Sequence, residues 1–303
     1  MSRIQDLLDK AEREGTVRRT RGLSSDTPLP VLFSADVQPA RPPQPALVET
    51  PSFGQPPAWT APPPVPPIDP ELREAPAPEL DGCLVAALAP HSLAAEQYRS
   101  LRTRIKRAEN GRPVRAIVIT SPAKGDGKSL TAANLALTMA QEFQQRILLV
   151  DADLRRPAVH SLFGLPEGPG LSDVLMGTSD LSAALMTLPE HSLTVLTAGS
   201  ACHHPAELLG STSMRRVLDT LRSRFDRILI DMPPVAPLAD LQVVAPMADG
   251  VLMIVRAGVT PKPAIEAALS GIDASKVLGL VLNETGTPAV GAAGYEGYGY
   301  IAG

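Results

Sequence analysis

Residues 121–129 read SPAKGDGKS and bring two glycines, a lysine and a serine into one short loop. Gly125 and Gly127 allow the backbone to turn so that its N–H groups point inward, as the binding of phosphate oxygens requires. Lys128 adds a positive charge suited to the β and γ phosphates of a nucleoside triphosphate, and the Ser129 hydroxyl can ligate Mg²⁺. This spacing is a Walker A motif, or P-loop, and it predicts that the chain binds ATP with Mg²⁺.

The P-loop lies between an apolar segment typical of a buried strand, Ala116–Thr120, and a helical pattern that begins at Leu130. A helix that starts there directs its positive end at the bound phosphates. The loop departs from the usual motif at Pro122, where Gly or Ala is common. The predicted nucleotide contacts are Gly125, Asp126, Gly127, Lys128, Ser129 and Leu130.

Three aspartates follow apolar segments farther along the chain. Asp151 and Asp153 end the segment that starts at Ile147, and they point the same way because side chains alternate along a strand. Asp231 ends the sequence FDRILID, which has the Walker B pattern of a hydrophobic strand followed by an acid. We predict that Ser129, Asp153 and Asp231 hold Mg²⁺, and that Asp151 accepts the proton of an incoming hydroxyl. The alternative is that Asp151 and Asp153 are helix-capping aspartates. The predicted catalytic residues are Lys128, Asp151, Asp153 and Asp231.

Apolar, β-branched segments alternate with helical patterns over residues 90–285. Strands that are apolar on both faces and separated by helices are typical of a buried parallel sheet with right-handed crossovers. The predicted fold class is therefore α/β, with a doubly wound, mostly parallel sheet. Ligands of such folds bind at the carboxyl ends of the strands, where each motif above lies. The expected strands are Val114–Thr120, Ile147–Val150, Leu193–Thr197, Arg227–Ile230, Val251–Val255 and Val277–Leu282.

Composition limits the class of protein further. The formal net charge of −4 argues against nucleic acid binding by the surface as a whole. The two cysteines, Cys83 and Cys202, have no spacing typical of a disulfide or a zinc site, as expected in a reducing cytoplasm. No apolar run reaches the roughly 18 residues of a membrane-spanning helix. We therefore expect a cytoplasmic protein that reaches a membrane only through a partner.

The segments outside the P-loop domain differ from it in composition. Of the 32 prolines, 17 lie between Pro28 and Pro78, which disfavours helices and central strands. We expect residues 22–80 to form a disordered, Pro-rich linker. Apolar residues at helical spacing predict a short amphipathic helix within residues 1–21. Residues 286–303, rich in Gly and Tyr, are expected to form a flexible tail.

Together, these motifs resemble the bacterial tyrosine kinases (BY-kinases) of capsule and exopolysaccharide biosynthesis, which are related to the MinD/ParA-type P-loop ATPases. The resemblance covers residues 90–303 and is most specific in LLVDADLRRPAVHSLFGLPEGPGLSDVL, Leu148–Leu175. It implies a tyrosine autokinase that regulates polymer export, with Asn283 near the adenine of ATP. It also implies a transmembrane chain-length regulator as activator, and so a location at the inner face of the cell membrane.

The sequence ExxRxxR, formed by Glu96, Arg99 and Arg102, also matches the family. Spacing of three places these side chains along one helical face, where opposite charges can meet a neighbouring subunit. The resemblance implies that this helix forms homo-oligomers. The alternative is an ordinary charged row in contact with solvent.

Three of the four tyrosines, Tyr295, Tyr298 and Tyr300, lie in the last nine residues. The resemblance implies that a neighbouring copy phosphorylates them, whereas the alternative is a low-complexity tail. The competing function is a non-kinase regulatory ATPase of the MinD/ParA type. Partition ATPases carry a signature lysine at the position of Ala123, and here the nearest lysine, Lys124, stands one place later. The sequence therefore favours the kinase.

Overall fold

The computed structural model of the chain describes residues 72–76, 79–109, 111–142, 145–235 and 240–285. The predicted N-terminal helix, most of the predicted linker and the tyrosine tail lie outside the described residues. Within the described part of the chain, no helix is long and apolar enough to cross a membrane.

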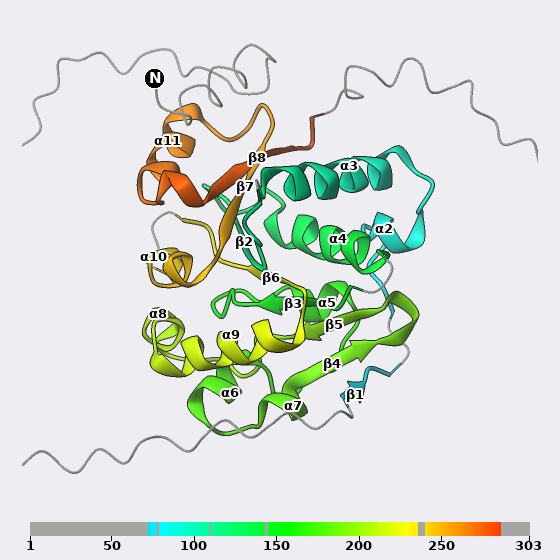
Figure 1. The fold of residues 1–303 in the computed structure, drawn as a ribbon, viewed down its shortest axis with the longest axis vertical. Coiled ribbons are helices and arrows are strands. Elements are labelled where there is room, and N and C mark those ends of the chain that lie inside the picture. The colour runs from blue at the N-terminus through cyan, green and yellow to red at the C-terminus, as the bar shows by residue number, and fades with distance from the viewer. Residues whose placement is uncertain (1–71, 77–78, 110, 143–144, 236–239, 286–303) are drawn as a thin grey trace, which may run out of the picture. The chain divides into compact units, whose positions relative to one another are not determined.

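The described residues form an eight-stranded sheet in the order β1-β4-β5-β3-β6-β2-β7-β8 (Figure 1). Neighbouring strands are parallel except for the antiparallel pair β4 and β5. The predicted α/β class with a mostly parallel sheet is therefore confirmed, and all six expected strands are present. The strands are β1 (Arg73–Glu74), β2 (Ala116–Thr120), β3 (Ile147–Asp151), β4 (Leu185–Leu188), β5 (Leu193–Leu196), β6 (Arg227–Asp231), β7 (Gly250–Arg256) and β8 (Val277–Asn283).

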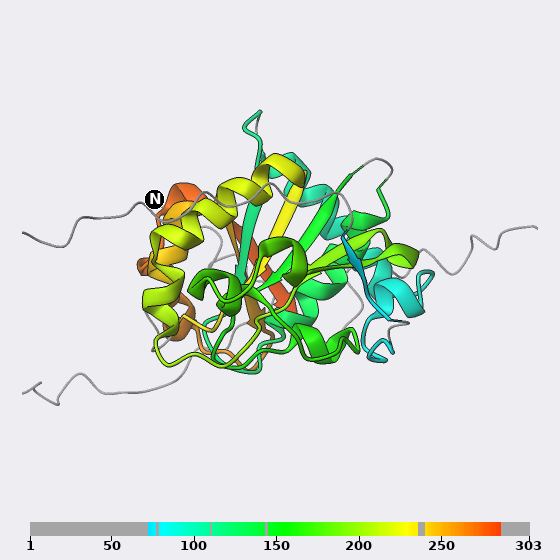
Figure 2. The same ribbon diagram turned by 90° about the horizontal axis from the view of Figure 1, so that it is seen from below.

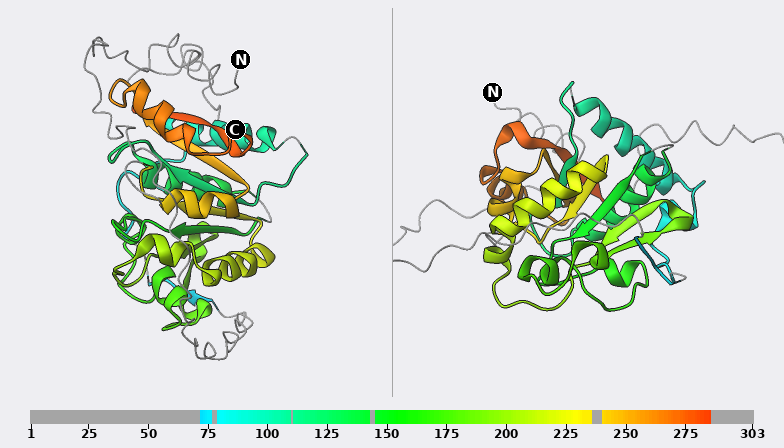
Figure 3. Two further views of the ribbon diagram at one scale, coloured as in Figure 1. Left: turned by 90° about the vertical axis from the view of Figure 1, so that its left-hand side faces the viewer. Right: turned by 60° about the horizontal axis from the view of Figure 1, so that its bottom comes forward.

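Helices cover both faces of the sheet, as the further views in Figures 2 and 3 show. The α-helices are α2 (Val85–Leu88), α3 (Leu93–Ala108), α4 (Lys128–Ala140), α5 (Val159–Leu162), α6 (Leu171–Met176), α7 (Leu181–Ala184), α8 (Pro205–Leu209), α9 (Thr212–Arg224), α10 (Asp240–Val244) and α11 (Lys262–Ser270). Short 3₁₀ helices span Pro189–His191, Ala245–Met247 and Ala274–Lys276.

The core has two layers because the strand side chains alternate between faces. On β2, Ile117 and Ile119 pack in the layer that contains residues of α3 and α4. Val118 points to the other layer, which contains residues of α6 to α11. Burial on both faces explains why the strands read as continuous apolar runs.

The first strand lies within the segment predicted as linker. Arg73 and Glu74 of β1 pair with β4 at the edge of the sheet, and the Ala75 N–H donates to the Thr187 carbonyl over 2.9 Å. Leu80 packs against the core. The folded chain thus begins before residue 80, the predicted end of the linker. Neither residue of β1 is a proline, so both keep the backbone N–H that strand pairing uses.

Candidate active site

The P-loop connects β2 to α4 through two backbone positions that favour glycine. Gly125 has φ +89° and Gly127 has φ +90°, in the left-handed region that L side chains rarely adopt. A Cβ atom at Gly127 would also lie 2.1 Å from the Asn283 side-chain nitrogen. The loop therefore depends on glycine at residue 127 for both conformation and space. Lys128, Ser129 and Leu130 form the first turn of α4 and are half-buried.

Topology brings the predicted acidic residues to the P-loop. Strand β6 lies between β2 and β3, and Asp151 of β3 is paired in register with Asp231 of β6. The Lys128 ammonium lies 2.8 Å from an Asp153 carboxylate oxygen and 3.4 Å from Asp231 Oδ1. It also donates to the Ser129 hydroxyl over 3.0 Å. The structure thus brings together Lys128 and Ser129 of the P-loop, Asp153 after β3 and Asp231 of the Walker B strand, which the sequence predicted from three separate segments.

Burial gives this cluster unusual electrostatics. Asp231 is fully buried, and desolvation raises its pKa to about 7 against the attraction of Lys128. Desolvation also opposes the charge on Lys128, but the carboxylates of Asp231 and Asp153 outweigh it and raise the lysine pKa. Three aspartates share one lysine, so the cluster holds more negative than positive charge when all are ionised. A cation is the ligand that this imbalance favours.

One oxygen of the cluster has no partner. Asp231 Oδ2 is buried without a hydrogen bond, and among the buried side-chain polar atoms of the described residues only Arg222 Nε shares that condition. A buried carboxylate oxygen without a partner is costly, which fits a site completed by bound water or a metal. No group of three or more His, Cys, Asp or Glu in the described ranges is arranged to hold a metal ion by itself. Such a site suits Mg²⁺, which keeps several waters and takes its other ligands from phosphates.

Asp151 holds a loop instead of facing the solvent. Its Oδ2 accepts the N–H groups of Ala158 and Val159, each over 3.0 Å, and its Oδ1 accepts the Asp153 N–H over 3.1 Å. Two of these bonds lie at the start of α5, whose N-cap residue is Ala158, so Asp151 contacts the helix start without being its cap. The carboxylate is fully buried, and desolvation raises its pKa to about 6 against these hydrogen bonds. Its predicted role as proton acceptor stays a prediction.

Known proteins resemble this chain in sequence and in fold. The AAA domain family matches residues 114–273 of the chain. Tyrosine-protein kinase YwqD of Bacillus subtilis (strain 168) is 39% identical over 202 residues, which cover 66% of this chain and 85% of YwqD. The chain belongs to the bacterial tyrosine kinase family.

Two further proteins are similar to the chain, one in structure and one in sequence. The kinase domain of Escherichia coli tyrosine kinase ETK has a TM-score of 0.63 at 28% identity, over 66% of this chain and 79% of that domain. Succinoglycan biosynthesis transport protein ExoP of Rhizobium meliloti (strain 1021) is 35% identical over 202 residues, 65% of this chain and 26% of ExoP. The chain is thus a protein-tyrosine kinase, and its P-loop domain implies ATP binding.

Asp126 contacts the rest of the kinase through its side chain as well as its backbone. Its carboxylate accepts the Ala123 N–H over 2.9 Å and the Thr260 hydroxyl over 2.7 Å. Its carbonyl accepts the Asn283 side-chain amide over 3.0 Å. Asn283 therefore lies against the P-loop, while its predicted place near the adenine stays a prediction. Thr260 was missed because nothing in the local sequence distinguishes it.

A second missed contact joins the segments after β3 and β6. Arg155 binds both carboxylate oxygens of Asp240, over 2.8 and 3.2 Å. Asp240 is fully buried at the start of α10, whereas the Arg155 side chain is 38% exposed. A bidentate pair of this kind ties the segment after β3, which carries Asp153, to the start of α10.

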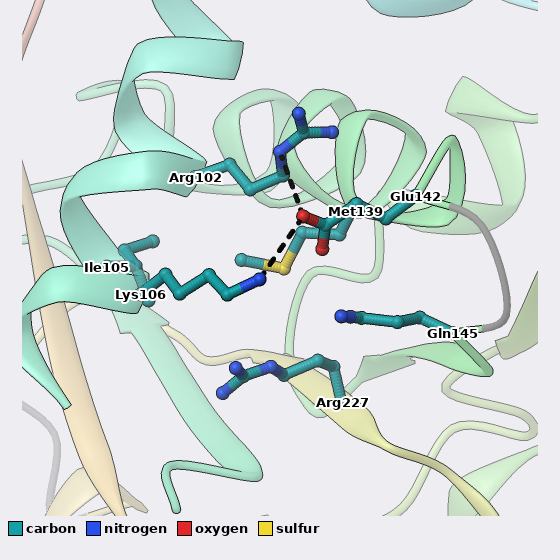
Figure 4. A pocket seen from close by; sticks show the side chains of 7 residues that line it. All are labelled: Arg102, Ile105, Lys106, Met139, Glu142, Gln145 and Arg227. Atoms are coloured by element: carbon teal, nitrogen blue, oxygen red, sulfur yellow. Dashed lines mark ion pairs between the residues drawn. The ribbon is translucent and has the colours of Figure 1, made fainter. Parts of the chain in front are cut away.

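The ExxRxxR side chains bind mostly within their own chain. Arg99 pairs with Glu96 and donates to the Pro90 carbonyl over 2.5 Å. Arg102 donates to the Thr138 carbonyl over 2.7 Å, near the end of α4. Figure 4 shows Arg102 and Lys106 both directed at Glu142, over 4.0 and 3.7 Å, beside a small hollow. The predicted role of these residues in oligomers stays a prediction.

Proposed function

We propose that the kinase transfers the γ-phosphoryl group of ATP to tyrosines on the tail of a neighbouring copy, at Tyr295, Tyr298 and Tyr300. The observation that carries this proposal is that the ammonium of Lys128, a P-loop residue, contacts both Asp153 and Asp231. Phosphoryl transfer requires mainly positioning and neutralisation of charge, and this cluster supplies both. The tail lies outside the described residues, so the acceptor is inferred from the sequence and the family.

Different residues of the chain would bind the phosphates and the Mg²⁺. P-loop amides from Gly125 to Ser129 orient the phosphates. Lys128 leaves the carboxylates and binds the β and γ phosphates, which present more negative charge. Mg²⁺, held by Ser129 with Asp153 and Asp231, would neutralise charge that develops on the transferred group. The unpartnered Asp231 Oδ2 supports that placement.

The tyrosine hydroxyl oxygen forms a bond to the γ-phosphorus as the bond from that phosphorus to the β–γ bridging oxygen breaks, and ADP leaves. The hydroxyl proton passes to a carboxylate, for which we keep Asp151 as the candidate. Its pKa, raised by burial to about 6, lies nearer to neutral pH than that of an ordinary aspartate. Reaching it requires the loop of residues 152–158 to move, because Asp151 is buried.

Asp151→Asn tests whether this residue is more than a loop anchor. An amide cannot accept all three N–H groups, so the variant should lose roughly 1–3 kcal/mol of unfolding free energy. If Asp151 also takes the proton, the rate at saturating ATP should fall about 10²-fold, even at temperatures where the variant is fully folded. If the rate of Asp151→Asn at saturating ATP stays within threefold of that of the parent chain, the role of Asp151 is structural only.

In this proposal, phosphorylation regulates assembly. Each phosphate adds roughly −1.5 to −2 charges, and a modified tail would be repelled from the three aspartates of the site. Cycling between assembled and dispersed oligomers would then control exopolysaccharide polymerisation and export. The name of ExoP, a succinoglycan transport protein, supports that setting. The family resemblance supports a transmembrane chain-length regulator as the activator and a location at the inner face of the membrane.

The direct test is incubation of the purified full chain with ATP and Mg²⁺, followed by mass spectrometry for phosphotyrosine. We expect modification at Tyr295, Tyr298 or Tyr300, and none when Mg²⁺ is chelated. Replacing all three with Phe should remove the signal but leave ATP turnover largely intact. ATP consumption with no phosphotyrosine, even with the cytoplasmic segment of a chain-length regulator added, would favour the regulatory ATPase instead.

A further inference from the structure

The turn that follows β7 is built around Thr260, which is 2% exposed. The Arg256 N–H donates to the Thr260 hydroxyl oxygen over 3.1 Å, and the Thr260 N–H donates back to the Arg256 carbonyl over 3.0 Å. These two bonds close the turn and fix where the hydroxyl lies. Because the backbone N–H can only donate, the hydroxyl must accept from it and keeps its own hydrogen for another partner.

That partner is the P-loop. The Thr260 hydroxyl donates that hydrogen to Asp126 Oδ1 over 2.7 Å. Asp126 stands between Gly125 and Gly127, the two P-loop residues with positive φ. The bond joins residues 134 positions apart in the sequence.

A second contact holds the same residue from β8. The Asn283 amide donates to the Asp126 carbonyl over 3.0 Å, and the Asn283 carbonyl accepts the Ala257 N–H over 2.9 Å. The ends of β7 and β8 therefore hold the side chain and the backbone of one P-loop residue. These contacts are separate from the bonds that join Lys128 to Asp153 and Asp231.

We propose that Thr260 is a positioning residue for the nucleotide phosphates: by binding the Asp126 carboxylate, its hydroxyl sets the P-loop backbone in the conformation that receives them. Without the hydroxyl, Asp126 Oδ1 would be buried with no donor, and the loop would shift to hydrate it. Backbone N–H groups must be aligned to bind phosphate oxygens, so the shift weakens nucleotide binding. The phosphoryl-transfer step after binding depends on other groups, so its rate changes less than the affinity for the nucleotide. The inference rests on the proposed ATP site.

Thr260→Val removes the hydroxyl at nearly constant size, and Thr260→Ser restores it. Calorimetric titration of the full chain with Mg–ADP avoids turnover during the measurement. We expect the Kd of the Val variant to rise about tenfold, and that of the Ser variant to stay within twofold of the parent chain. At saturating ATP, kcat should fall less than about threefold, so the defect lies in KM. Thr220→Val is the matched control, because the Thr220 hydroxyl donates only to Arg216 in its own helix.

Asp126→Ala removes the acceptor from the other end of the same bond. It should also raise the Kd about tenfold, and adding Thr260→Val to it should cause no more than a twofold further loss. A Val variant that binds Mg–ADP within twofold of the parent chain, or losses that multiply in the double variant, would overturn the proposal. If Thr260→Val does not fold, Thr260→Ala, which also lacks the hydroxyl, takes its place under the same criterion. Failure of the parent chain itself to bind ADP or ATP would instead refute the proposed function.

Discussion

Helix α4 has a cluster of charges at each end, and the two clusters differ in how completely they are satisfied. At its start, Lys128 faces Asp153 and Asp231 with 12%, 4% and 0% of their side chains exposed, and one carboxylate oxygen has no partner. At its end, Arg102 and Glu142 are 22% and 28% exposed and have partners on the same chain.

Only the first cluster shows the features of a reactive site. A buried charged group without a full set of partners costs folding free energy. A protein keeps such a group where a bound ligand supplies the missing partner. The second cluster ties α3 to α4, and its charges are close to solvent, where ion pairs contribute little. The two clusters contain similar numbers of charged groups. Burial and the missing partner therefore distinguish the functional end of α4 from the other end.

The largest expected difference between the two ends follows from removing the cation at each. Lys128→Met should lower the phosphotyrosine rate about 10³-fold, since it deletes the charge that stabilises the transferred phosphate. With an added tyrosine peptide as the substrate, so that the reaction does not depend on contact between copies, Arg102→Met should change the phosphorylation rate less than threefold. Rates from radiolabelled ATP measure both. Comparable losses in the two variants would contradict the functional difference between the clusters.

Asp231→Asn should separate stability from activity at the first cluster. Because burial raises the pKa of Asp231 to about 7, its ionisation destabilises the folded chain. The stability that the carboxyl contributes is complete below about pH 4 and is lost as the pH rises through about 7. Asparagine undergoes no such loss, so the nucleotide-free variant should exceed the parent chain by roughly 1–3 kcal/mol at pH 8, and by less at pH 5.

Thermal unfolding at the two pH values measures this gain, and phosphotyrosine formation by the same sample should be severely reduced. A variant whose Tm at pH 8 equals or falls below that of the parent chain would show that Lys128 already compensates the carboxylate.

The smallest expected effect belongs to the second cluster. Arg102→Met should lower the unfolding free energy by about 1 kcal/mol, because the Thr138 carbonyl near the end of α4 loses a charged donor. The Kd for Mg–ADP should not change. Denaturant unfolding and calorimetry on one preparation provide both values, and weaker nucleotide binding in this variant would show that the two ends of α4 are coupled.

Sequence motifs predicted much of the first cluster because they combine local spacing with strand ends. Lys128 and Ser129 follow from the P-loop, and Asp153 and Asp231 follow apolar strands whose carboxyl ends meet at one edge of the sheet. The same patterns identified six strands. The edge strand β1 was not predicted, because two residues between prolines form it only through pairing with β4.

Contacts between residues far apart in sequence could not be predicted. The bonds from Arg155 to Asp240 and from Thr260 to Asp126 join positions 85 and 134 residues apart. Asp151 accepts the N–H groups of Ala158 and Val159 because the backbone of residues 152–158 folds back to it. The motif that contains Asp151 does not determine that backbone path. Motifs therefore located the reacting groups, and tertiary structure was needed to find what positions them.

In the proposed function, the active site of one chain phosphorylates the tail of another, and a mixing experiment tests this transfer between copies. One full-length variant carries Lys128→Met with an intact tail, and the other keeps its P-loop but has Phe at residues 295, 298 and 300. With tags of different mass, the account predicts no phosphotyrosine on either variant alone and phosphotyrosine on the Lys128→Met chain when the two are mixed with ATP and Mg²⁺. Mixing that leaves this chain unmodified, although the unaltered chain becomes phosphorylated under the same conditions, would contradict transfer between copies.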